Sequence, residues 1–164
     1  MPKGDEPCEK DFVIIHSLSY VFSSICFAYG KDIPADRVAV GGIHLWDTVK
    51  MVRDLHGRPT RVEAWSYSEQ QEEECRFEYY GTGNELCVSR KQGRIIFLRV
   101  TSNSQWGTPD KIGIGSSKAD VLAIYGPYDP PYSEENRYVY FTKNGNLGFD
   151  FENDKVSTII LSYE

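Results

Sequence analysis

The segment 113–117, Gly-Ile-Gly-Ser-Ser, precedes a predicted helix and could hold a phosphate group on its free backbone N–H groups. A Walker loop would continue with Gly-Lys followed by Ser or Thr, and the chain has no such tripeptide at that place. Residues 44–47 precede an earlier predicted helix in the same way and contain no glycine. We therefore interpret the segment as the start of a helix and not as a phosphate site.

Histidine and cysteine are too few and too dispersed to predict a metal centre. The chain has 3 His and 4 Cys, and neither His44 nor His56 has further ligands at a compatible spacing. No Ser-His-Asp or Cys-His grouping indicates nucleophilic catalysis. Two carboxylates could still meet in space and act as acid and base, because spacing in the sequence does not exclude it. We expect no cofactor, no metal and no enzymatic activity.

Cys75 and Cys87 form a candidate disulfide across a predicted hairpin. An oxidising compartment would favour the bond. If this hairpin has the register of the later one, odd-numbered residues face even-numbered ones and the two side chains point to opposite faces. The bond would then need a bulge or a different loop. The sequence leaves both alternatives open.

The N-terminal region has features of a secretory leader. Residues 12–30 are apolar apart from His16 and a few serines, and Cys26-Phe27-Ala28 places small residues where a signal peptidase cleaves. Acidic residues outnumber the two lysines that precede this run, so a retained anchor and a buried helix stay open as alternatives. We expect residues 1–28 to be a signal peptide or apolar leader and the protein to be secreted or periplasmic. Membrane contact is expected only through an uncleaved leader.

The composition indicates a folded chain that is rich in sheet. Of the 164 residues, 40% are hydrophobic and 26% are charged, which is typical of a globular protein. The chain has 11 Tyr and only 2 Met, and aromatic residues favour strands. The formal charge of −6 argues against nucleic acid, whose phosphates require a basic surface.

The same order of elements is predicted twice. The first helix is expected to begin after Asp47, an N-cap, and to end at Gly57. A strand is predicted over 60–67, then a hairpin over 75–90 and a strand over 94–100. The inner face of this helix is expected to consist of Val49, Val52 and Leu55.

In the second copy, Ser117 and Asp120 have the spacing of a capping box, and Gly126 ends the helix. The dipeptide Asn144-Gly145 predicts a hairpin between 137–142 and 147–152, followed by a last strand over 155–163. The expected cross-strand pairs are Tyr140 with Phe149 and Tyr138 with Phe151.

These patterns predict an α+β fold of two tandem helix–β-hairpin–strand units, residues 29–101 and 102–164. Alone, each unit would bury little surface and would leave sheet edges exposed. We expect the units to join into one antiparallel sheet with both helices packed on one face.

The paired residues Ile43/Leu45 and Ile112/Ile114, the capped helices with their terminal glycines and the aromatic hairpins resemble the SmpA/OmlA (BamE-like) unit over residues 38–163. Two such units on a secreted chain resemble the fold of the β-lactamase inhibitory protein family. The first copy departs from the pattern, with Trp46 where Gly115 stands in the second. The resemblance implies this fold, an envelope or extracellular location and a function in binding proteins.

The aromatic residues of the predicted sheet are the candidate binding site. Leu98 and Val100 match a later apolar pair and are expected to face the core, so that Phe97 and Arg99 face outward. Trp65 and Tyr67 are expected to join them, and exposed aromatic residues beside arginine are typical of interface hot spots. The alternative is that they lie under loops or across the junction of the two units. We predict a non-enzymatic module that binds a protein partner through an open sheet face. A structural cell-envelope component is the alternative, and a hydrolase inhibitor ranks below both.

Overall fold

The computed structural model describes residues 33–128, 134–143 and 145–163. The expected leader, residues 1–28, lies outside the described residues. In the part of the chain that is described, no helix is long and apolar enough to cross a membrane.

Along the described chain, each α-helix is followed by a group of strands. The helical elements are η1 (Ala35–Arg37), α1 (Val49–His56) and α2 (Lys118–Tyr125). The strands are β1 (Arg61–Val62), β2 (Ser66–Ser68), β3 (Glu73–Tyr80), β4 (Asn84–Ser89), β5 (Ile95–Val100), β6 (Arg137–Thr142), β7 (Gly145–Glu152) and β8 (Lys155–Ser162).

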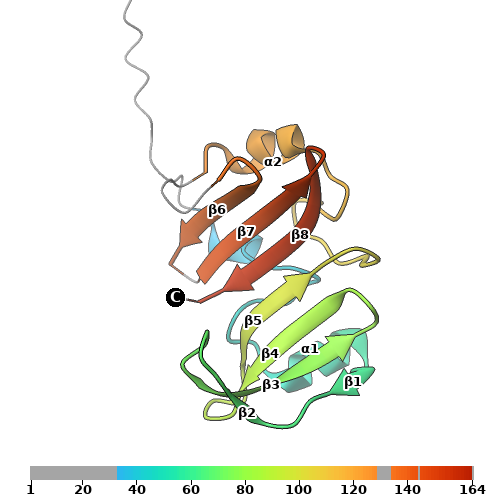
Figure 1. Ribbon diagram of the computed structural model, residues 1–164, viewed down its shortest axis with the longest axis vertical. Helices are drawn as coiled ribbons and strands as arrows, with labels where there is room; N and C mark the ends of the chain where they lie inside the picture. The colour runs from blue at the N-terminus through green and yellow to red at the C-terminus, as the bar shows by residue number, and fades with distance from the viewer. Residues whose placement is uncertain (1–32, 129–133, 144, 164) are drawn as a thin grey trace, which may run out of the picture.

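All eight strands belong to one antiparallel sheet, which runs the length of the molecule (Figure 1). The strand order is β1-β3-β4-β5-β8-β7-β6, and β2 also pairs with β3. At the centre β5 pairs with β8, where Phe97 lies opposite Ser162 and Val100 opposite Ile159.

The predicted α+β class with two tandem helix–hairpin–strand units is therefore wrong. The described chain is predominantly β, because one hydrogen-bonded sheet of eight strands carries the architecture and each of the two α-helices has only 8 residues. The direct pairing of β5 with β8 continues the ladder across the expected boundary at residues 101 and 102, so no break in the sheet marks two units. The boundary itself stays a prediction.

The two hairpins of the sheet have different registers. In β3–β4, Tyr80 lies opposite Asn84, so a three-residue loop separates the strands and residues of the same parity face each other. In β6–β7, Thr142 lies opposite Gly145, and residues of opposite parity face each other. A change of one residue in loop length changes which residues pair.

The expected pairs in the second hairpin are also wrong. Tyr140 lies opposite Leu147, and Tyr138 lies opposite Phe149. We had expected β7 to begin at Leu147 after a longer turn, whereas the strand already begins at Gly145. The shorter connection moves each partner by two positions along β7.

The residues predicted to end the helices do so, with the exception of the N-cap of α1. The capping box of α2 is confirmed, since Ser117 accepts a hydrogen bond from the Asp120 N–H and Asp120 accepts one from Ser117 in return. Gly57 and Gly126 end the two helices with φ of 77° and 80°. The N-cap of α1 is Thr48 and not Asp47, whose carboxylate instead accepts a bond from the His44 N–H at 2.8 Å.

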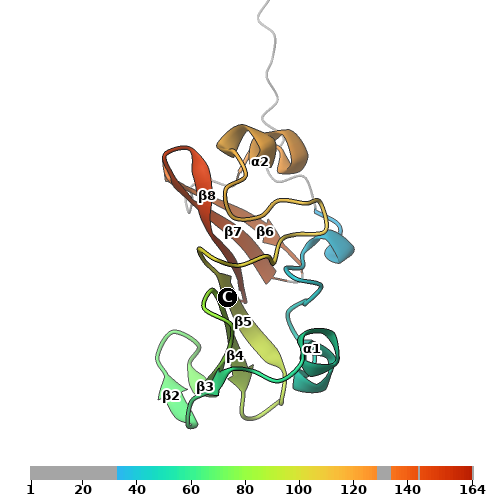
Figure 2. The same cartoon turned by 90° about the vertical axis from the view of Figure 1, so that its right-hand side faces the viewer.

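Both α-helices lie on the same side of the sheet (Figure 2). The main core fills the space between them and the sheet, and its fully buried side chains include Val52, Leu86, Leu98, Val121, Leu147, Phe149, Ile159 and Leu161. Of the inner residues predicted for α1, Val52 is buried and Val49 is half-buried, but Leu55 is 60% exposed. The interface below α1 is therefore narrower than predicted.

Candidate functional site

The face of the sheet that points away from α1 and α2 is called the outer face here. Side chains alternate along a strand, so the residues next to core residues such as Leu86 and Leu98 on each strand lie on the other face. At the centre of the sheet the outer face consists of Phe77 and Tyr79 on β3, Glu85 and Cys87 on β4, Phe97 and Arg99 on β5, and Ile160 and Ser162 on β8.

Phe97 and Arg99 lie at the middle of the outer face, as the alternation of β5 predicted. Arg99 lies opposite Ile160 on one side and Glu85 on the other. Its Nε donates to Glu85 Oε2 at 3.0 Å, and its Nη2 donates to the same oxygen. This double hydrogen bond holds the Arg99 guanidinium group in a defined position beside the side chains of Phe97 and Ile160.

In the ion pairs of the outer face, the arginine side chain is more exposed to solvent than the carboxylate side chain. The exposed fractions of the side chains are 59% and 40% for Arg61 and Glu63, 47% and 17% for Arg99 and Glu85, and 51% and 25% for Arg137 and Asp150. Arg61 also lies over the Tyr79 ring, 3.7 Å from its centroid. The outer face is therefore a surface of half-buried aromatic groups and outward-facing guanidinium groups.

Trp65 does not join this surface. Its indole ring lies below the Arg76 guanidinium carbon, 4.6 Å from it, and lines a hollow together with residues of α1. Tyr67 is exposed on β2 and lies opposite Glu74. Glu74 is next to the outer-facing Cys75, so Glu74 and Tyr67 both belong to the other face of the sheet. The structure brings together Phe97 and Arg99 but places the other two predicted residues elsewhere.

A shift of register explains where Trp65 lies. On β1, Arg61 lies opposite Tyr79, whereas on β2 Ser66 lies opposite Cys75, one residue out of step. With one continuous strand over 60–67, as predicted, Trp65 would lie opposite Cys75 on the outer face. A one-residue slip moves a side chain to the other face of a sheet.

Cys75 and Cys87 point to the same face, because this hairpin does not have the register of the later one. Cys75 lies opposite Ser89 and Phe77 lies opposite Cys87, which makes the two cysteines diagonal neighbours on the outer side. Both are fully buried free thiols, packed with Ile96 and covered by aromatic side chains. Burial, followed by the neighbouring Cys75 thiol, raises the pKa of Cys87, so this group stays a neutral thiol at ordinary pH.

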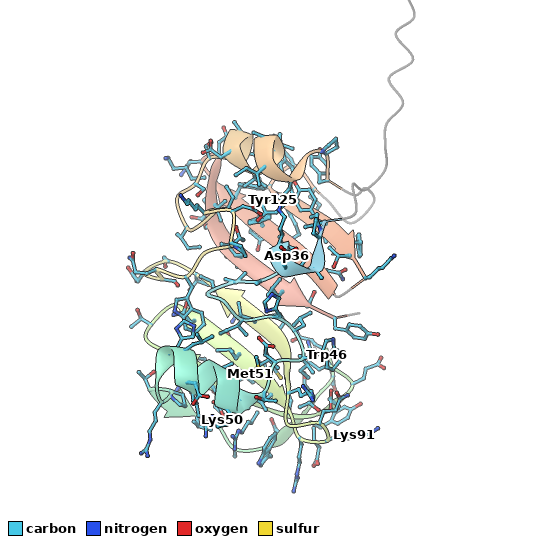
Figure 3. The ribbon with its side chains drawn as sticks, turned by 180° about the vertical axis from the view of Figure 1, so that it is seen from behind. Asp36, Trp46, Lys50, Met51, Lys91 and Tyr125 are labelled. Carbon is cyan, nitrogen blue, oxygen red and sulfur yellow. The ribbon has the colours of Figure 1, made fainter. Side chains whose placement is uncertain are left out.

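A second concave site, called the α1 hollow, lies between α1 and the sheet and has a volume of about 710 Å³. Figure 3 shows this side of the molecule, with Lys50 on α1 and Tyr125 at the end of α2. The hollow is lined by Val49, Lys50, Arg53, Asp54, Gly57, Arg58, Trp65, Arg76, Val88, Arg90 and Gly93.

A buried carboxylate organises the charges beside the hollow. The Glu78 side chain is only 2% exposed, and its Oε1 accepts hydrogen bonds from Arg53 at 2.9 Å and from Arg76 at 2.7 Å. The Tyr80 hydroxyl donates to Oε2 at 3.3 Å. Burial and then the Glu78 charge raise the pKa of Tyr80 to about 12.

Our sequence reasoning missed this cluster. The available signal was the alternation of β3, where Arg76 and Glu78 occupy the same face as Tyr80 and therefore face the helix. Two charged residues at core-facing positions of a strand are unusual, because a buried charge requires a partner.

The glycine-rich segment before α2 uses its backbone N–H groups within the chain. Gly113 N–H donates to Ser116 Oγ at 3.0 Å, and Gly115 N–H donates to the Val156 carbonyl at 2.8 Å. These bonds anchor the start of the helix to β8, so these amides are occupied and not available to a phosphate group.

His44 and His56, the histidines among the described residues, make separate contacts. His56 Nε2 lies 2.7 Å from the Gly41 carbonyl, and its ring packs on Trp106 with a centroid distance of 4.0 Å. His44 Nδ1 lies 3.6 Å from Asp47 Oδ2. Among the described residues, no group of three or more His, Cys, Asp or Glu side chains could hold a metal ion.

Comparison with known proteins gives only a weak likeness. No family model matches the chain, and no curated protein matches it. A cysteine-rich secretory protein from Staphylococcus aureus is similar in structure, with a TM-score of 0.45 and 11% identity over 81% of this chain and 47% of that chain. An extracellular protein containing an SCP domain from Bacillus anthracis has a TM-score of 0.42 and 10% identity over 96% of this chain and 50% of that chain.

The resemblance to a tandem BamE-like repeat protein is therefore wrong. The similar solved structures are secretory and SCP-domain proteins, and no SmpA/OmlA model matches the chain. The chain spans about half the length of these two proteins. At TM-scores of 0.45 and 0.42 the likeness carries no argument about activity, so the function has to be argued from this chain's own surfaces.

Proposed function

We propose that this is a secreted or periplasmic, non-enzymatic protein that binds a partner protein through the outer face of its sheet. The observation that supports the proposal is the position of Phe97 and Ile160 beside the guanidinium group of Arg99, which faces solvent more than its partner Glu85. Aromatic residues and arginine dominate the binding energy of protein interfaces.

The chemistry of the surface defines the partner. The arginines of three ion pairs lie on the same face as half-buried aromatic side chains, and each arginine is more exposed than its carboxylate. The complementary partner has an apolar centre with carboxylates around it. Glu85 fixes Arg99 before binding, which lowers the entropy lost when the interface forms.

The proposed location rests on the apolar segment 12–30 and its small residues before Tyr29. A leader of this kind delivers the protein outside the cytoplasm, where a protein-binding surface would meet envelope or extracellular partners.

The test is site-specific photo-cross-linking in the native host, followed by affinity measurements. A photo-reactive amino acid at position 97 is expected to capture one partner, which is then purified. Phe97→Ala and Arg99→Ala are each expected to weaken its binding by about tenfold or more. The control is Lys143→Ala, which removes an exposed charge at the far end of the sheet. Unchanged affinity in both outer-face variants would refute the proposal.

A further inference from the structure

We infer that the α1 hollow is a binding site for a small anion that carries several phosphate or carboxylate groups. The hollow lies on the helix side of the sheet, with residues of α1 in its lining, so the inference is independent of the outer face and of the partner proposed for it.

The lining of the hollow has an excess of positive charge. It contains Lys50, Arg53, Arg58, Arg76 and Arg90 but only one carboxylate, Asp54. Even when the ion-pair partners Glu74 and Glu78 are included, five cationic groups face three carboxylates, which leaves two positive charges. This excess lies in a chain of net charge −6, and a concave surface of one sign concentrates the field on a counter-ion.

The cationic groups are held in place before any ligand binds. Glu78 fixes the guanidinium groups of Arg53 and Arg76 through one oxygen. The Trp65 ring supports Arg76 at 4.6 Å and Arg90 at 5.9 Å. A ligand would therefore meet guanidinium groups whose side-chain freedom is already restricted, which favours binding.

Unused hydrogen-bond donors remain in this arrangement. The Nε of Arg76 is buried and has no hydrogen-bond partner among the described residues. Arg58 has no carboxylate in ion-pair distance within the described part of the chain. A guanidinium group carries five N–H donors in a planar fork that matches the oxygens of phosphate and carboxylate. The accessible spare donors are those of Arg58, and they fit an oxyanion, whereas the Arg76 Nε is itself buried.

The size of the hollow fits a small organic ligand. Its volume of about 710 Å³ lies within the usual range of ligand sites, roughly 300–1,000 Å³. Val49, Val88 and Trp65 add apolar surface between the charged groups. This combination suits a ligand with anionic groups on a short carbon skeleton. Pyrophosphate has no carbon skeleton and therefore tests the recognition of charge alone.

The experiment is isothermal titration calorimetry of the whole protein with pyrophosphate and with citrate at low ionic strength. We expect binding of at least one of them, and the stronger ligand identifies phosphate or carboxylate as the recognised group. Arg58→Ala and Arg90→Ala are each expected to weaken binding by about tenfold, the effect of one lost hydrogen bond to a charged group. Neither change leaves a buried charge unpaired, so both variants are expected to fold.

The matched control is Lys143→Ala, which removes the same unit of charge far from the hollow. It is expected to bind both anions as the parent protein does, and so is Phe97→Ala on the outer face. The inference is overturned if neither anion binds at millimolar concentration. It is equally overturned if Lys143→Ala weakens binding as much as Arg58→Ala, since the protein would then respond only to its overall charge.

Discussion

The helices α1 and α2 have equal length and pack on the same face of the sheet, but the layers between each helix and the sheet differ in their residues. Below α2, Tyr125 packs on Tyr140 and on Phe149, with centroid distances of 5.5 Å in both pairs. Below α1, the corresponding space holds the Glu78 carboxylate and two guanidinium groups, and about 710 Å³ stays open. Equal helix length and similar glycine ends therefore do not imply equal function.

The difference originates in the strands and not in the helices. The inner positions of β6 and β7 carry large aromatic residues such as Tyr138 and Phe149, which fill the layer below α2. The inner positions of β3 carry Arg76 and Glu78. Charged side chains keep water or a ligand close, because their burial without a partner is unfavourable. The filled end of the sheet is built for stability, and the open end can hold a ligand.

Glu78→Ala is expected to have the largest effect on this comparison. Removing the buried carboxylate leaves Arg53 and Arg76 without their shared partner, and breaking a buried pair costs about 3–5 kcal/mol. Urea unfolding measures the loss. The control Glu85→Ala breaks an ion pair whose carboxylate is 17% exposed, against 2% for Glu78, and is expected to cost about 1 kcal/mol or less. Equal losses in the two variants would contradict the organising role of Glu78.

The pH dependence of stability is expected to identify the same end of the sheet. The pKa of the Tyr80 phenol is about 12 in the folded protein, whereas in the unfolded chain it is the ordinary value of about 10. The unfolded state therefore binds fewer protons in this window, and the free energy of unfolding falls by up to about 2 kcal/mol as the pH rises from about 10 to about 12.

Chemical unfolding at several pH values checks this expectation. Tyr80→Phe should reduce the decline between about pH 10 and pH 12 without abolishing it, because burial also raises the pKa of Tyr125. Tyr67→Phe, which alters an exposed phenol, should leave it unchanged. A decline of equal size in Tyr80→Phe would show that another group is responsible.

Sequence patterns predicted the ends of the helices because those ends depend on neighbouring residues only. Gly57, Gly126 and the Ser117–Asp120 pair satisfy backbone groups within one turn of the helix. The same patterns failed for the sheet registers, which depend on one residue more or less in a loop. The three-residue loop between Tyr80 and Asn84 gives the first hairpin its own register and places both cysteines on one face, a point that the sequence left open.

The candidate site was predicted only in part for the same reason. Phe97 and Arg99 follow from the alternation of β5, a single regular strand, and they lie together on the outer face. Trp65 follows the register shift between β1 and β2 and lies in the α1 hollow. The hollow itself needs residues from α1, β3 and β4 to meet, and no local pattern encodes such a meeting.

The helix caps give a smaller contrast between the two ends. Ser117→Ala removes the bond that Ser117 Oγ accepts from the Asp120 N–H and the one that it donates to Asp120 Oδ2, and it keeps the bond from the Ser117 backbone N–H. The expected cost is about 1–2 kcal/mol, whereas Thr48→Ala removes a single bond of 3.3 Å and is expected to cost about 0.5 kcal/mol. Thermal unfolding of the two variants measures the difference. Hydrogen bonds from Ser117 also lower the pKa of Asp120, so the contribution of this box is present above the ordinary carboxyl pKa and is lost on acidification. A larger loss of stability in Thr48→Ala than in Ser117→Ala would contradict the expectation that the cap of α2 is the stronger of the two.

The smallest expected effect tests whether the layer below α2 is optimised for stability. The Tyr125 hydroxyl is buried and has no hydrogen-bond partner among the described residues, although its ring packs tightly. Tyr125→Phe keeps the ring and removes an unsatisfied polar group, so the free energy of unfolding is expected to stay equal or to rise by about 1 kcal/mol. In the control Tyr140→Phe, the hydroxyl that is lost donates to the Gly126 carbonyl at 3.1 Å, and a loss of about 1 kcal/mol is expected. A loss in Tyr125→Phe as large as that in the control would mean that this hydroxyl has a bound partner, and the filled end of the sheet would then also contain a polar site.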